Sequence, residues 1–104
     1  MKADCDSEAD AVLIELEKVD QWDRGVLIDD AMYCDVAFRG DRAVAVSLRY
    51  PREELRLLDD AAERFEFDAD VLRAATEAAL GLPDREVTIE VGPRRLVGRA
   101  AKTL

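Results

Sequence analysis

The stretch from Arg42 to Leu80 reads RAVAVSLRYPREELRLLDDAAERFEFDADVLRAATEAAL and decides the fold. Its first part alternates strictly, as a β-strand does, between two sets of side chains. The two sets are Val44, Val46 and Leu48 on one face, and Ala45, Ser47 and Arg49 on the other. Pro51 ends this strand because it has no backbone N–H to donate, yet proline is tolerated in the first turn of a helix. The pattern therefore predicts a short strand followed directly by a helix.

Two helices are predicted after Pro51. Apolar residues recur at helical spacing over residues 52–65, which predicts the first helix. Asp68 is a favourable N-cap, so we expect the second helix over residues 69–80, with Gly81 ending it. Residues 42–80 thus form the predicted strand–helix–helix core.

The segments before this core are predicted to be a hairpin, an ambiguous stretch and a disordered end. Residues 33–39 alternate and end at Gly40-Asp41, which predicts a β-hairpin with the strand that follows. Residues 11–19 fit either a helix face or a strand face, and helix propensity slightly favours a helix. Residues 1–10 are polar and acidic, and we expect them to be disordered.

The C-terminal end carries the strongest charge contrast of the chain. Residues 86–91 alternate and Gly92-Pro93 follows, which predicts a C-terminal β-hairpin over residues 86–100. From Gly92 onward the charged residues are Arg94, Arg95, Arg99 and Lys102, which together carry a charge of +4. Because the net charge of the whole chain is −9, the first 91 residues carry −13. Arg94, Arg95 and Arg99 are candidates for binding a partner or an anion. The alternative is a solvated edge hairpin whose arginines prevent strand pairing.

Composition bounds the class of protein. A chain of 104 residues with 49% apolar residues predicts a single globular domain. The longest apolar runs are too short for a membrane span or a signal peptide, and Cys5 and Cys34 form no CxxC pair. We therefore expect a cytoplasmic protein with two reduced thiols and no membrane contact.

Catalytic chemistry is not indicated. The chain has no histidine, which removes the commonest general base and metal ligand. The adjacent carboxylates Asp29-Asp30 and Asp59-Asp60 point apart on any regular element, and we interpret them as solvated surface. We expect no enzyme activity, no cofactor and no metal ion.

The order strand, proline, helix, turn and helix over residues 43–80 resembles the ribbon-helix-helix family of small dimeric regulators and antitoxins. The resemblance rests on Val44, Val46, Leu48, Pro51, Leu55, Ala61, Ala62, Phe65, Phe67, Leu72 and Ala75. It implies an α+β fold in which a short strand is followed by two helices, here with flanking β-hairpins. It also implies a homodimer whose paired strands enter the major groove of a DNA operator.

Under this resemblance the base-reading residues are those on the outward face of the strand, Ala45, Ser47 and Arg49. Arg42, at the start of the strand, is a further expected DNA contact. Arginine and serine hydrogen-bond to bases in the groove, whereas alanine offers an apolar contact.

A second hypothesis uses the same residues differently. If the Gly40-Asp41 hairpin forms, residues 33–39 pair with the strand and share the face that should read DNA. The chain is then a non-DNA-binding α+β module of the immunity-protein or inhibitor type. Its acidic surface, from a net charge of −9, would bind a basic protein partner.

Overall fold

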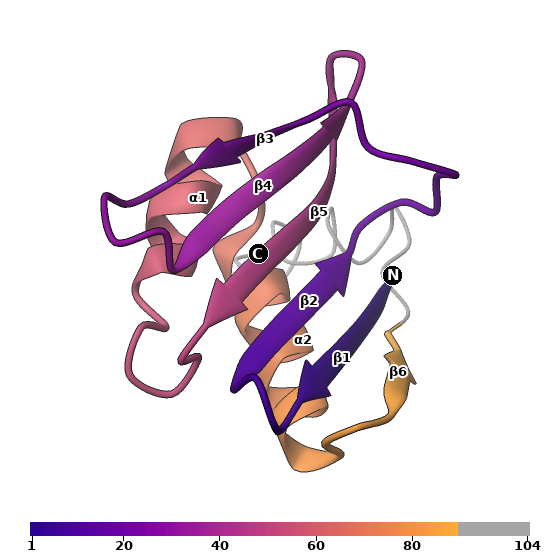
Figure 1. Cartoon of the computed structure of the whole chain (residues 1–104), viewed down its shortest axis with the longest axis vertical. Coiled ribbons are helices and arrows are strands. Elements are labelled where there is room, and N and C mark those ends of the chain that lie inside the picture. Colours follow the sequence, from indigo (N-terminus) through magenta and orange to yellow (C-terminus); the bar gives the residue numbers. More distant parts are fainter. Residues whose placement is uncertain (90–104) are drawn as a thin grey trace, which may run out of the picture.

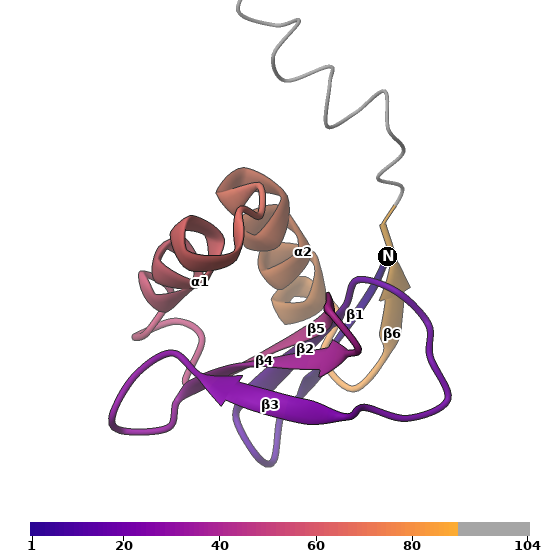
Figure 2. The ribbon, with the colours of Figure 1, turned by 90° about the horizontal axis from the view of Figure 1, so that it is seen from above.

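The computed structural model describes residues 1–89, which form six strands and two helices (Figure 1). The elements are β1 (Lys2–Asp6), β2 (Ala11–Glu15), β3 (Arg24–Leu27), β4 (Cys34–Arg39), β5 (Arg42–Arg49), α1 (Leu57–Phe65), α2 (Ala69–Gly81) and β6 (Glu86–Thr88). The strands make one antiparallel sheet in the order β3-β4-β5-β2-β1-β6. Both helices pack on the same face of this sheet (Figure 2).

Strand β5 lies in the interior of the sheet and is paired along both edges within the chain. Val46 of β5 lies opposite Val36 of β4 on one side and opposite Ile14 of β2 on the other. The strand therefore has no free edge with which to form a ribbon with a second copy. The predicted fold class, a short strand followed by two helices with flanking hairpins, is wrong in its strand content: the helices cover a six-stranded antiparallel sheet.

The hairpin at Gly40-Asp41 is confirmed. A β-bulge next to it means that Val44 does not share a face with Val46 and Leu48 as predicted. The register of β4 against β5 shifts between Ala37 and Phe38, so one strand carries an extra residue. Val46 and Leu48 remain in the core under the helices. Val44 instead joins a second buried cluster with Ala37 and Ala45.

The two N-terminal expectations are corrected by the sheet. Residues 1–10 are not disordered, because β1 pairs with β2 on one side and with β6 on the other. Residues 11–19 contain a strand, not a helix. Val12 and Ile14 alternate into the core, where they are 1% and 0% exposed. Pairing with both neighbours thus outweighs the modest helix propensity of this stretch.

The helices follow the prediction more closely. Asp68 is the N-cap of α2, and its carboxylate accepts hydrogen bonds from the backbone N–H of Asp70 and Val71. Helix α1 begins at Leu57, later than the predicted residue 52, because the chain first makes turns in which Glu53 and Glu54 donate to the carbonyl of Tyr50. Within residues 1–89, neither helix has the length and apolarity needed to cross a membrane.

At the C-terminal end, the first part of the predicted hairpin forms strand β6, which pairs with β1 so that Val87 lies opposite Ala3. The remainder of the predicted hairpin over 86–100, with Arg94, Arg95 and Arg99, lies outside the described residues.

We expect Glu66→Gly to raise the free energy of unfolding by about 1 kcal/mol, because a non-glycine residue in the left-handed region is strained by roughly that amount. Glu66 caps the C-terminus of α1 with φ of 60° and ψ of 40°. Urea unfolding followed by circular dichroism measures the change. The matched control is Glu63→Gly on the exposed side of the same helix, which should lose about 1 kcal/mol. A loss in both variants would contradict the assigned backbone conformation.

Candidate protein-interaction face

The candidate site is the sheet face opposite the helices, which we call the open face. Within residues 1–89, no helix lies over it (Figure 2). Strand pairing brings six side chains into one row across all the strands, each opposite the next. In order from edge to edge they are Glu86, Asp4, Leu13, Ser47, Asp35 and Leu27. Residues far apart in the sequence thus form one continuous surface.

The centre of the open face is apolar and built on small residues. Ala37 and Ala45 lie opposite each other and are 3% and 1% exposed. Val44 is buried with them, and the half-buried side chains of Leu13 and Val19 pack against this cluster. The open face therefore has an apolar centre that is only partly covered.

Carboxylates crowd the end of the open face formed by β1, β2 and β6. Burial raises the pKa of Asp4, and so do the negative charges of Glu86, Glu15 and Asp6 around it. One cation is among them: Lys2 Nζ lies 3.2 Å from a carboxylate oxygen of Glu86. Because these neighbouring charges add to the effect of burial on the pKa of Asp4, the ionised carboxylates repel one another.

A hollow of about 330 Å³ lies at the same end of the sheet, lined by β1 and by the chain leading into β6. It is lined by Cys5, by the carboxylates of Asp4, Asp6, Asp84 and Glu86, and by the cationic side chain of Arg85. Asp84 is held in place because Ser7 donates to it twice, from the backbone N–H at 2.9 Å and from the hydroxyl at 2.6 Å. These bonds hold the pKa of Asp84 below its usual value. The carboxylates of the hollow therefore outnumber its one lining cation, Arg85, and its net charge is negative at neutral pH.

A further carboxylate, Asp35 on β4, lies on the other side of the apolar centre. It is half-buried, and burial raises its pKa, while a hydrogen bond from the Ser47 side chain partly opposes the shift. The apolar centre is thus bordered by acidic side chains on two sides.

The residues predicted to read DNA have different surroundings from those that the resemblance implied. Ser47 is hydrogen-bonded to Asp35. Ala45 is buried in the small cluster of the open face. Arg42 pairs with Glu17 at 2.9 Å, and the exposed Arg49 lies 5.9 Å from the Tyr50 ring. Ala45, Ser47 and Arg49 share one face as expected, but that face also carries the carboxylates described above.

The two thiols are poor nucleophiles. Cys5 and Cys34 are free and buried. Burial, followed by the charges of Asp35 and Asp29, raises the pKa of the Cys34 thiol to about 12. Burial also raises the pKa of Cys5. Since the thiolate is the reactive form, neither residue is suited to covalent catalysis at neutral pH.

Sequence reasoning missed the acidic end because Asp4 and Asp6 lie in a segment predicted to be disordered. A signal was present, since Ala3 and Cys5 alternate with these aspartates as inward and outward residues of a strand do. Only these two inward positions lie beside the aspartates, which is too few to outweigh the polar composition.

Three comparisons with known proteins give no further guidance. No protein-family model, no curated protein and no solved structure matches this chain. Its function is therefore inferred from the open face alone.

Proposed function

We propose that this protein is an interaction module that binds a basic segment of another protein across the open face. The observation that carries the proposal is the partly covered apolar centre, Leu13 and Val19 over small buried residues, bordered by carboxylates. Protein interfaces combine an apolar core with a polar rim, and complementary charge directs the approach of the correct partner.

The carboxylates around Asp4 are arranged for binding at the expense of fold stability. A carboxyl group whose pKa is raised by folding destabilises the folded state once pH exceeds the unfolded value, here 3.8. Arginine or lysine side chains of a partner would remove the repulsion among Asp4, Glu15 and Glu86. Groups that are strained in isolation and relieved by a ligand are common at functional sites.

The overall charge supports a basic protein over a nucleic acid. The net charge of −9 raises the local concentration of cationic partners and speeds their association. The same charge repels phosphate, whose binding depends on lysine and arginine contacts.

The proposal is tested by removing the same charge from two places. The first variant combines Asp4→Asn, Glu15→Gln and Glu86→Gln on the open face. The control combines Glu53→Gln, Glu63→Gln and Glu77→Gln, which lie on the loop and helices. Binding of a labelled peptide of alternating arginine and leucine is followed by fluorescence anisotropy. We expect the open-face variant to bind about tenfold more weakly, since three exposed ion pairs contribute up to roughly 0.5 kcal/mol each.

The control variant should keep nearly the parent affinity. Equal losses in both variants would show that net charge alone attracts the peptide, and would refute the open face as the site. Loss of folding is not expected, because Asp4→Asn removes repulsion and should raise the urea midpoint at pH 7, with no gain below pH 3.8.

The same assay with labelled duplex DNA distinguishes the proposed function from the hypothesis of a DNA-binding regulator. Sequence-selective binding that weakens steeply with salt and is lost in Arg49→Ala would favour that hypothesis over the proposed function. We expect no such binding.

A further inference from the structure

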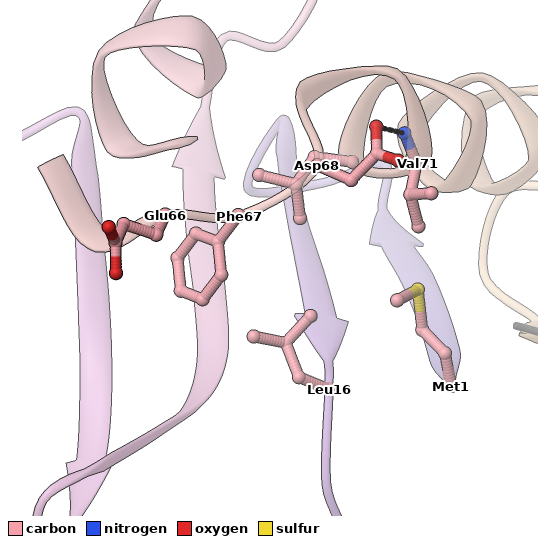
Figure 3. A pocket seen from close by; sticks show the side chains of 7 residues that line it. Met1, Leu16, Glu66, Phe67, Asp68 and Val71 are labelled. Atoms are coloured by element: carbon pink, nitrogen blue, oxygen red, sulfur yellow. Dashed lines mark hydrogen bonds between the residues drawn. The ribbon is translucent and has the colours of Figure 1, made fainter. Parts of the chain in front are cut away.

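A second recess lies on the helix side of the sheet, away from the open face. It encloses about 290 Å³ between the chain end at Met1 and the turn that joins α1 to α2. Figure 3 shows Leu16 and Phe67 directed toward each other, with Met1 and Val71 beside them. Glu66 and Asp68 also line this recess, which we call the groove. Its wall is therefore mainly apolar with two carboxylates.

The described chain ends beside the groove. Ile89 donates its backbone N–H to the carbonyl of Met1 at 2.8 Å, and Met1 lines the groove. The side chain of Ile89 is half-buried against the main core. The remaining residues, 90–104, thus start next to the groove.

The chemistry of residues 90–104 matches the groove. The segment reads EVGPRRLVGRAAKTL, in which Leu96 and Val97 lie between Arg94-Arg95 and Arg99. Its apolar pair suits the apolar wall, and its arginines suit the negative charge of Glu66 and Asp68. Leu96 is seven residues from Ile89, so an extended chain reaches up to about 23 Å, which allows entry into a recess that begins at Met1.

We propose that residues 90–104 bind in the groove of their own chain, with Leu96 and Val97 against its apolar wall. The arginines then have a role within the molecule and are not the contacts of an external partner. The proposal is independent of the proposed function, because the groove and the open face lie on opposite sides of the sheet.

A spin label attached to residues 90–104 of the full-length protein tests whether this segment binds in the groove. Ala101→Cys supplies the attachment site, and labelling near pH 7 is selective because Cys5 and Cys34 are buried with raised pKa values. The methyl signals of Leu16 and Val71 are recorded by NMR before and after reduction of the label. We expect selective loss of their intensity, while the methyls of Val26 in the distant strand β3 keep theirs.

The matched control carries the same label together with Leu96→Asp and Val97→Asp, which leave residues 1–89 untouched. In this variant the groove signals should recover their intensity. No selective loss with the original label, or the same loss in the control, would overturn the proposal. Mixing spin-labelled chains with isotope-labelled chains distinguishes a segment donated by a second copy, and signal loss in that mixture would also overturn it.

Discussion

Replacing Leu48 by alanine is expected to lower the free energy of unfolding by about 2–5 kcal/mol, the range for deleting a buried leucine side chain. Leu48 is 0% exposed in the interior strand β5. It lies opposite Cys34 of β4 and Val12 of β2, and it belongs to the core cluster under the helices. Neighbours on three sides limit how far the site can collapse around the missing atoms.

Urea unfolding monitored by circular dichroism measures this loss. The control is Leu27→Ala on the edge strand β3, where the side chain is 50% exposed, and there we expect a change within about 0.5 kcal/mol. Because a domain of this size is stable by only about 5–15 kcal/mol, Leu48→Ala should remove a large fraction of the total. Similar effects of the two substitutions would be incompatible with an interior position for β5.

The part of the fold that sequence predicted correctly is the part specified locally. Gly40-Asp41 marks a hairpin, Asp68 supplies an N-cap, and both features depend on residues within a few positions of each other. The helix pair and the alternation of β5 were recognised for the same reason. Each signal is complete within one short window of the chain.

What sequence did not predict depends on pairings between distant segments. Val12 and Leu48 lie opposite each other although many residues separate them, and β6 joins the sheet by pairing with β1 at the opposite end of the sequence. The resemblance to ribbon-helix-helix proteins reproduced the local order of elements. It could not reveal that β2 occupies the edge of β5 that the hairpin with β4 leaves open.

The open face was unpredictable for the same physical reason. Its row from Glu86 through Asp4 to Asp35 crosses five strands and exists only in the correct register. A shift by one residue in any strand would move that strand's side chain to the other face. The acidic composition was visible in the sequence, but its concentration around Asp4 was not.

Asp29 and Asp30 show how two identical neighbours differ once the chain folds. Both were interpreted as solvated surface. In the structure, Asp29 Oδ1 accepts hydrogen bonds from the backbone N–H of Tyr33 at 3.0 Å and of Cys34 at 2.9 Å. Its carbonyl also accepts from Met32, which has a positive φ of 64°. Asp29 thus stabilises the turn that precedes β4.

We expect Asp29→Ala to lower the free energy of unfolding by about 3 kcal/mol, because two hydrogen bonds to a charged acceptor contribute roughly 1.5–3 kcal/mol each and water replaces part of the loss. Asp30→Ala is the matched control. It removes the same charge from an exposed side chain and should change stability by no more than about 0.5 kcal/mol. Equal effects would mean that net charge, and not the turn, determines the result.

Asp29→Asn separates hydrogen bonding from charge at the same position. The amide oxygen of asparagine can occupy the place of Oδ1 and accept from both Tyr33 and Cys34, but without the negative charge that strengthens such bonds. Neutral hydrogen bonds are about half as strong, so we expect roughly half of the loss seen with alanine. If asparagine were as harmful as alanine, the charge itself would be the stabilising element. If asparagine were harmless, the position of the acceptor oxygen, without its charge, would account for the stabilisation of this turn.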